Sequence, residues 1–316
     1  MSRSSSWSGP FRRALAASVL VVSSAAVLVP SAAEAMVPAP AGSASCSAWT
    51  KTTIASGYPT LENLAFDGQG SLLLSADPAT GNGALLRLGA DGARSTVLSK
   101  VNAPGGLVVD GRTLYLNTGN SLVSGAFAKA DGTVSKVNLD TGAISTVASG
   151  LVMPNGLVRL PGGDFVVSRD LGKGSMTRVS ALGAKSPFEA TATSTNGMAV
   201  DAARGLFYVD STFNLKTVIS AFDLADPAAA PRTIVVPGLG PANSADDLTL
   251  GSDGYLYVAL NAAGKVIRVD PDSGAQCTIA TGIPFVSSVR FGAGPGWDAS
   301  SLYATSFRGT VTRLTP

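Results

Sequence analysis

The hydrophobic and polar positions of this chain follow a plan that recurs about six times after residue 60. Each unit has a polar or glycine-containing turn, a β-branched run, a second turn at glycine, and another β-branched run. A repeat of about 40 to 50 residues with several short strands per unit is typical of β-propeller blades. The pattern therefore predicts an all-β fold, a six-bladed β-propeller. The first strands of the units start at Glu62, Gly105, Asn155, Asn196, Asp246 and Ser287, which lie 41 to 50 residues apart.

The fifth unit shows the plan most clearly. Its runs 247–250, 255–260, 265–269 and 276–280 are rich in β-branched and aromatic residues, and glycine-containing turns separate them. Such runs predict four antiparallel strands joined by tight turns, which make one blade.

The last unit lacks a strand, because only the runs 289–291, 302–305 and 310–314 precede the end of the chain. A further β-rich run at residues 48–55 stands ahead of the first unit. If it joins the last blade, it closes the ring and covers an exposed sheet edge, which is an aggregation liability. The sequence predicts this closure.

The N-terminus has the composition of a secretory signal peptide. Arg3, Arg12 and Arg13 precede an apolar run at 14–30, and Ala-Glu-Ala at 33–35 fits a cleavage site. We expect residues 1–35 to be removed, so that the protein is secreted. The alternative is an N-terminal membrane anchor, although the run is at the short limit for a span. Residues 36–47 then form a flexible lead-in, and the propeller domain covers residues 48–316.

The charge balance argues against polyanionic partners. The 23 basic and 21 acidic residues of the whole chain lose three Arg and one Glu with residues 1–35, which leaves a formal net charge of 0. With no basic stripe visible, nucleic acid and an anionic membrane surface are not expected as partners. We expect a monomer that binds a small molecule and has no stable membrane association after cleavage.

Cysteine and histidine content narrow the chemistry. Cys46 and Cys277 are the only cysteines, and in an exported chain they are expected to form one disulfide, the alternative being two separate thiols. Cys46 stands at the start of the closing run, so a bridge would staple the ring. The chain has no histidine, which excludes Ser-His-Asp and Cys-His catalysis and His-ligated zinc.

Four units open with oxygen-bearing side chains at equivalent positions: Glu62, Asn155, Asn196 and Asp246. Equivalent positions of propeller blades converge on one axis, so the four should meet there. Two carboxylates and two amides suit a hard cation, calcium or magnesium. The alternative is ordinary turn chemistry, because Asn-Gly and Asp are common at strand starts.

Two blocks of the sequence resemble a known family, that of senescence marker protein, gluconolactonase and luciferin-regenerating enzyme. The first is Thr-Asn-Gly-Met at 195–198 with Gly-Leu-Phe-Tyr-Val-Asp-Ser at 205–211. The second is Ala-Asp-Asp-Leu at 245–248 with the run 253–271. The resemblance implies a six-bladed propeller with one divalent metal on its axis, held by Glu62, Asn196 and Asp246, with Asn155 contacting metal or substrate. It also places Ser168, Arg169, Asp170 and Asn214 at the pocket mouth.

The sequence departs from the family pattern at two informative positions. Asp247 replaces a glycine, so two adjacent carboxylates compete for one ligand position. Strand alternation sends them to opposite faces, and register favours Asp246. Met153 stands where the family carries an arginine that suits sugar substrates, so the metal site is more securely implied than sugar specificity.

We therefore expect a divalent-metal-dependent hydrolase of a lactone or related ester, with calcium as first choice and magnesium, manganese or zinc as alternatives. The metal would polarise the substrate carbonyl, and Asp246 is the first candidate for the base, with Asp247 as its alternative. Met153, Arg169 and Asn214 are the expected substrate-pocket residues. The alternatives are a non-catalytic binding propeller with a structural calcium, and a propeller enzyme resembling strictosidine synthase.

Overall fold

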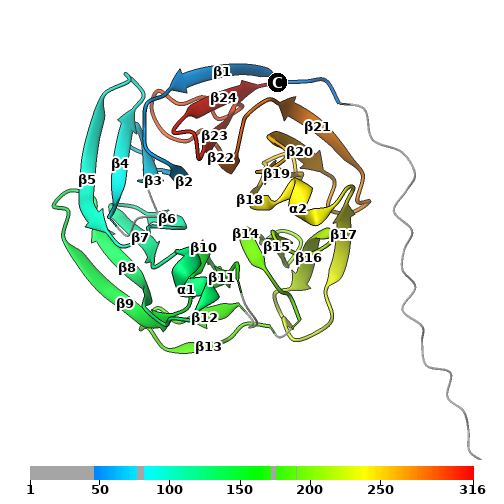
Figure 1. The fold of residues 1–316 in the computed structure, drawn as a ribbon, viewed down its shortest axis with the longest axis horizontal. Helices are drawn as coiled ribbons and strands as arrows, with labels where there is room; N and C mark the ends of the chain where they lie inside the picture. Colours follow the sequence, from blue (N-terminus) through cyan, green and yellow to red (C-terminus); the bar gives the residue numbers. More distant parts are fainter. Residues whose placement is uncertain (1–45, 77–81, 172–175, 190) are drawn as a thin grey trace, which may run out of the picture. The chain divides into compact units, whose positions relative to one another are not determined.

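The protein is a ring of six four-stranded antiparallel sheets around a central axis, as the ribbon shows (Figure 1). The predicted six-bladed β-propeller is therefore confirmed. The predicted signal peptide, and all but the last two residues of the predicted lead-in, lie outside the described residues. The structure, a computed structural model, describes residues 46–76, 82–171, 176–189 and 191–316.

Each of the first five blades is built from four strands that are consecutive in sequence and run outward from the axis. Blade one contains β2 (Leu61–Phe66), β3 (Ser71–Ala76), β4 (Gly83–Gly89) and β5 (Arg94–Val101). Blade two contains β6 (Leu107–Asp110), β7 (Thr113–Thr118), β8 (Gly132–Asn138) and β9 (Ile144–Leu151). Blade three contains β10 (Pro154–Arg159), β11 (Phe165–Arg169), β12 (Thr177–Val179) and β13 (Lys185–Pro187). Blade four contains β14 (Thr195–Asp201), β15 (Leu206–Ser211), β16 (Thr217–Asp223) and β17 (Arg232–Val236). Blade five contains β18 (Ala245–Leu250), β19 (Leu256–Leu260), β20 (Lys265–Val269) and β21 (Gln276–Thr281).

Blade six joins the two ends of the propeller domain. Its strands β22 (Val286–Phe291), β23 (Leu302–Ser306) and β24 (Val311–Thr315) are completed by β1 (Thr50–Ala55), which pairs antiparallel with β24. The predicted closure by residues 48–55 is thus confirmed, with the strand itself starting at Thr50. Pairing β1 with β24 satisfies the backbone groups that would otherwise form an open edge.

A disulfide between Cys46 and Cys277 ties this closing strand to blade five. Beside it, the Trp49 backbone N–H donates to the Ile279 carbonyl at 2.8 Å, so the segment before β1 runs along β21. The bridged residues are 231 positions apart. Cross-linking so long a loop restricts the unfolded chain and stabilises the fold by about 5–6 kcal/mol in the chain-entropy model.

The two ends of the propeller have different connections. At one end, short hairpin turns join the first strand of each blade to the second and the third strand to the fourth. At the other end, loops join the second strand to the third and lead from each outer strand into the next inner strand. The two short helices, α1 (Leu122–Ala126) and α2 (Gly240–Asn243), lie in loops of this second end. No helix in the described part of the chain is long and apolar enough to cross a membrane.

The hydrophobic core lies between neighbouring blades. Ile219 of blade four packs in one cluster with Leu248 and Val258 of blade five, and all three are fully buried. Alternating side chains of each strand fill the two faces of its sheet, so every blade is covered on both sides by its neighbours. This packing fixes the inner strands around the axis and so positions the site.

Candidate functional site

The inner strands are irregular where they carry the predicted site residues. In β2, for example, the pairing with β3 skips from Leu61 to Asn63, and in β18 it skips from Ala245 to Asp247. A residue that leaves the ladder at such a bulge is re-aimed by the local bend of the strand. The residues skipped in this way include Glu62, Asn155, Asn196 and Asp246.

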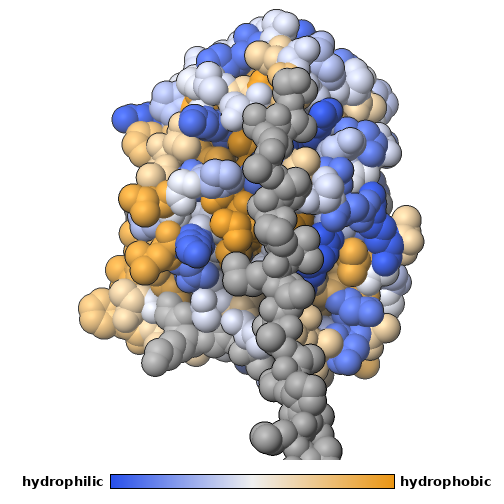
Figure 2. Space-filling view, turned by 90° about the vertical axis from the view of Figure 1, so that its right-hand side faces the viewer, coloured by the Kyte–Doolittle hydropathy of each residue, from blue (hydrophilic) through white to orange (hydrophobic). Residues whose placement is uncertain are grey.

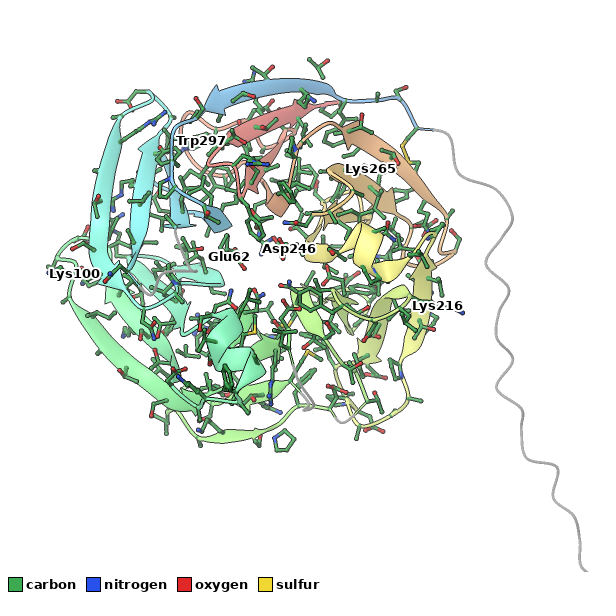
Figure 3. All side chains as sticks on the ribbon, in the orientation of Figure 1. Glu62, Lys100, Lys216, Asp246, Lys265 and Trp297 are labelled. Atoms are coloured by element: carbon green, nitrogen blue, oxygen red, sulfur yellow. A yellow bond between two sulfur atoms is a disulfide. The ribbon has the colours of Figure 1, made fainter. Side chains whose placement is uncertain are left out.

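These strand starts surround one cavity of about 430 Å³ at the axis. Glu62, Asn155 and Asp246 line it, and Figure 3 shows Glu62 and Asp246 pointing into the centre of the ring from β2 and β18. Asn196 lies directly behind the wall, because its Nδ2 donates to Asp246 Oδ1 at 2.9 Å. The structure thus brings all four predicted residues to one place.

Asp246 is held by amides on both oxygens. Asn196 donates to Oδ1, and Asn261 Nδ2 donates to Oδ2 at 2.8 Å. Asn196 is itself oriented by Thr212, whose Oγ1 accepts from the same Nδ2 at 3.1 Å. The Thr212 hydroxyl in turn donates to the Ala245 carbonyl at 2.7 Å. The carboxylate therefore has a fixed position on the cavity wall.

Glu62 faces the cavity from blade one, which only blade six separates from blade five. Asn120 Nδ2 donates to its Oε1 at 2.9 Å. Burial raises the pKa of Glu62 to about 7, although the Asn120 hydrogen bond lowers it, and the negative charge of Asp247 raises it further.

Asp170 is a third buried carboxylate on the cavity wall, placed just after β11. Burial raises its pKa to about 8, a hydrogen bond with Thr212 acts in the opposite direction, and the charge of Glu62 raises the pKa further. Burial also raises the pKa of Asp246 well above its ordinary value, and the charges of Glu62 and Asp170 add to this. The site thus concentrates negative charge that the cavity wall itself does not neutralise.

The neighbouring Asp247 faces away from the cavity. Its Oδ2 accepts from Arg290 Nη1 at 2.5 Å, from the Val289 N–H at 3.2 Å and from the Ser288 hydroxyl. Asp247 is therefore a buried partner of an arginine in blade six. Of the two adjacent carboxylates, only Asp246 reaches the cavity, as strand register favoured.

Two oxygen atoms of the cavity residues are buried without a hydrogen-bond partner among the described residues: Asp170 Oδ1 and Asn120 Oδ1. A buried acceptor without a donor is costly, which suggests that another group satisfies it. Among the described residues, no cluster of three or more His, Cys, Asp or Glu could hold a metal ion. The donor set here instead mixes carboxylates with amides, and its all-oxygen chemistry fits a hard cation.

The predicted pocket residues divide into one that lines the cavity and two that do not. Met153 lines the wall and is buried. Arg169, the last residue of β11, turns away and donates from Nε to the Leu171 carbonyl at 2.8 Å. Asn214 lies outside the wall, where its side chain bonds Thr193. Side chains of neighbouring residues along a strand point to opposite sides, so Arg169 faces away from the cavity and the next residue, Asp170, lines it.

Several wall residues were not expected from the sequence. Asn120, Thr212 and Asn261 stand in loops or turns, and such residues ordinarily serve turn chemistry. The apolar part of the wall comes from Leu122, Phe213 and Phe307, again in loops. Their only sequence signal is that each follows the second strand of a blade, at the same end as the inner-strand starts.

The fold and the cavity define a six-bladed β-propeller with an acidic, amide-supported site on its axis. Residues 163–308 match the family model described as SMP-30/Gluconolactonase/LRE-like region. The resemblance that the sequence blocks predicted is thereby confirmed.

Individual relatives agree with this. Regucalcin of Xenopus laevis is 30% identical over 102 residues, a match that spans about a third of each protein (32% of this chain, 33% of regucalcin). A gluconolactonase of Xanthomonas campestris has the same fold, with a TM-score of 0.66 and 19% identity over 84% of this chain and 89% of its own. A luciferin-regenerating enzyme superimposes with a TM-score of 0.65 and 15% identity over 85% of this chain and 95% of its own.

Proposed function

We propose that this protein is a divalent-metal-dependent hydrolase of a lactone or related ester. The observation that carries the proposal is the convergence of Glu62, Asn155, Asn196 and Asp246, from four separate blades, at one cavity. The family likeness supports the same reading, since proteins of this fold named gluconolactonase and luciferin-regenerating enzyme are among its neighbours.

Glu62, Asn155 and Asp246 would hold the cation, with Asn196 as a ligand or as the support of Asp246. Calcium is the first choice, because carboxylate and amide oxygens are its preferred ligands, with magnesium, manganese and zinc as alternatives. A bound cation would supply Lewis-acid polarisation of the substrate carbonyl. Its charge would also offset the burial and the mutual repulsion that raise the pKa values of the cavity carboxylates.

The chain's own residues supply the proton transfers. In ester hydrolysis a water oxygen adds to the carbonyl carbon, the ring C–O bond breaks, and the departing alkoxide takes a proton. Asp246, held by Asn196 and Asn261, is oriented to accept a proton from that water. Asp170 lies on the same wall, and burial raises its pKa in the metal-free protein, so it is our candidate to give a proton to the leaving oxygen.

The wall of the cavity favours a substrate less polar than a sugar lactone. Leu122, Phe213 and Phe307 join Met153 around the opening, and Met153 stands where the resemblance implies an arginine. Compared with a cavity that carries this arginine, a polyol bound here would lose a charged hydrogen bond and gain only apolar contacts.

The experiment is a lactone panel with the metal controlled. Protein stripped of metal should be inactive, calcium should restore turnover, and aliphatic or aromatic lactones should react faster than gluconolactone. Asp246→Asn should remove the activity, whereas Asp272→Asn, far from the cavity on an exposed turn, should not. Absence of turnover on every lactone and ester, with calcium bound, would overturn the hydrolase.

One observation favours a second candidate, a binding propeller with a structural calcium. Both oxygens of Asp246 already accept hydrogen bonds, so this carboxylate is less available as a base. Calcium binding without turnover in the same panel would support this candidate.

Export through the N-terminal segment is the location that we propose. The disulfide between Cys46 and Cys277 supports it, because disulfides persist in oxidising compartments. N-terminal sequencing of protein recovered from the medium should begin close to Met36. A protein retained in cells with residues 1–35 intact would contradict export by cleavage.

A further inference from the structure

Large hydrophobic side chains are exposed around the mouth of the cavity. Their exposed fractions range from 42% at Phe285 to 81% at Leu215. They stand in loops of different blades, and Leu122 and Phe213 also line the cavity itself. We call this set the apolar rim, and it consists of Leu122, Val123, Phe127, Phe213, Leu215, Leu239 and Phe285.

The rim belongs to one end of the propeller, which we call the site end. This end carries α1 and α2, and it lies at the left edge of Figure 2, where hydrophobic residues gather. At the opposite end, the large hydrophobic side chains exposed among the described residues are Ile144 and Leu182. Single exposed hydrophobic residues are normal, but a set gathered at one place marks an interaction surface.

Cations accompany the rim. Lys129 follows Phe127 in one loop, Lys216 follows Leu215 in another, and the Arg308 guanidinium lies 5.0 Å from the Phe285 ring centroid. Lys265, at the start of β20, is a fourth exposed cation at this end. We call Lys129, Lys216, Lys265 and Arg308 the basic flank. No ion pair between described residues uses any of them.

Acidic groups are nearly absent from the described surface of the site end. Asp131 is its one exposed carboxylate there, and it accepts from Ser124 Oγ at 2.9 Å. The turns of the opposite end carry the exposed carboxylates Asp91, Asp110, Asp140, Asp223, Asp226, Asp253, Asp272 and Asp298. Arginines of the opposite end pair with some of these carboxylates, so its charges are mixed, whereas the exposed charges of the site end are mainly cationic.

We propose that the site end adsorbs reversibly to an anionic lipid surface, with the apolar rim inserted among the acyl chains and the basic flank on the phosphates. Exposed apolar side chains accompanied by cations at one end of the fold are what such an interface requires. The charge complementarity of the basic flank favours this occupant over a neutral surface. The expectation that anionic membranes are not partners rested on the net charge and on the absence of a basic stripe in the sequence, and neither shows which cations the fold gathers at one end.

Adsorption would also turn the cavity mouth toward the lipid. If the protein is the hydrolase proposed above, an apolar ester dissolved in the lipid would enter without crossing water. The adsorption itself does not depend on that activity, so it is measured without any substrate.

The experiment is co-sedimentation of the exported protein with phosphatidylglycerol vesicles and with phosphatidylcholine vesicles, at low and high salt. We expect binding to phosphatidylglycerol that weakens as salt screens the charges. Phe127→Ser and Leu215→Ser should each weaken it about tenfold, and Lys129→Gln and Lys216→Gln about fivefold each. The matched controls are Leu182→Ser at the opposite end, which removes a leucine that is 97% exposed, and Lys136→Gln on β8. Both controls should bind as the unchanged protein does.

Three results would overturn the proposal. One is the absence of binding to either vesicle. Another is binding that the control variants weaken as much as the rim variants do. The third is concentration-dependent self-association, in sedimentation velocity without lipid, that Phe127→Ser and Leu215→Ser abolish, because a second copy would then be the occupant of the rim.

Discussion

The two ends of this propeller share one scaffold but treat carboxylates in opposite ways. At the site end, burial raises the pKa values of Glu62 and Asp170 to about 7 and about 8. At the opposite end, Asp201 is also buried, but the hydrogen bonds and charge of Arg204 outweigh burial and lower its pKa. The cavity carboxylates at the site end thus have only amide and hydroxyl partners, whereas an arginine neutralises Asp201 at the opposite end.

The difference shows what each end contributes. Ion pairs at the opposite end, such as those of Arg204 with Asp201 and Asp272, stabilise the hairpin turns within the blades. At the site end, unneutralised carboxylates cost stability and are kept only where something else compensates, which is a common property of functional sites.

The largest expected effect comes from removing charge at the site end. Asp246→Asn should weaken calcium binding about a hundredfold or more, because it removes one of few charged ligands. The same change should raise the melting temperature of the metal-free protein, since a buried carboxylate with a raised pKa is replaced by a neutral group.

Isothermal titration calorimetry with calcium, and thermal unfolding with and without it, measure both effects. Asp272→Asn at the opposite end is the control and should leave calcium affinity unchanged. Unchanged affinity in Asp246→Asn would remove Asp246 from the metal site. If Asp247→Ala abolished calcium binding and Asp246→Asn did not, the ligand would be Asp247 and not Asp246.

The pH dependence should differ in direction between the ends. The raised pKa values of Glu62 and Asp170 mean that the folded state binds more protons than the unfolded state between about pH 5 and 8. The metal-free protein should therefore lose stability as pH rises through that window. The lowered pKa of Asp201 means that its carboxylate stabilises the fold at every pH above the ordinary pKa of an aspartate. This contribution is lost as the pH falls through the lowered pKa.

Calorimetric melting temperatures across pH 3 to 9 test this, with chelator and then with excess calcium. Calcium should flatten the loss at high pH, and Glu62→Gln should reduce it. A metal-free melting temperature that stays level or rises from pH 5 to 8 would contradict the description of the site end.

A smaller effect, on the free energy of unfolding, is expected from a substitution at the opposite end. Asp201→Asn should lower the free energy of unfolding by about 2 kcal/mol at pH 7, because it weakens charged hydrogen bonds from Arg204 at a buried position. Urea unfolding measures the loss, and Asp226→Asn on an exposed turn is the control. Calcium affinity should not change in either variant, and a change in Asp201→Asn would show that the two ends are coupled.

The smallest effect concerns substrate choice. Met153→Arg places a cation in the cavity wall and should raise kcat/KM for gluconolactone, relative to an aliphatic lactone, about tenfold. Met153→Leu keeps the wall apolar and should leave the ratio as it is. Equal ratios in all three proteins would mean that Met153 does not set polarity.

Much of the architecture follows from the sequence, because repeat period and strand alternation are local properties. The six units and the closing strand at residues 48–55 were predictable in this way, and the structure has both. The pairing of Cys46 with Cys277, which the structure also has, was predictable because they are the only cysteines. The equivalence of Glu62, Asn155, Asn196 and Asp246 was visible for the same reason, since equivalent positions of a repeat share one place in the fold.

Other features depend on contacts between blades, which no local pattern contains. Blade two contributes no side chain from its inner-strand start, because a Cβ at Gly105 would lie 2.8 Å from the Asn155 carbonyl oxygen of blade three. Asp247 is separated from Asp246 by its ion pair with Arg290, which is 43 residues away in sequence. The amides of Asn120 and Asn261 join the site only because closing the ring brings loops of different blades to one face.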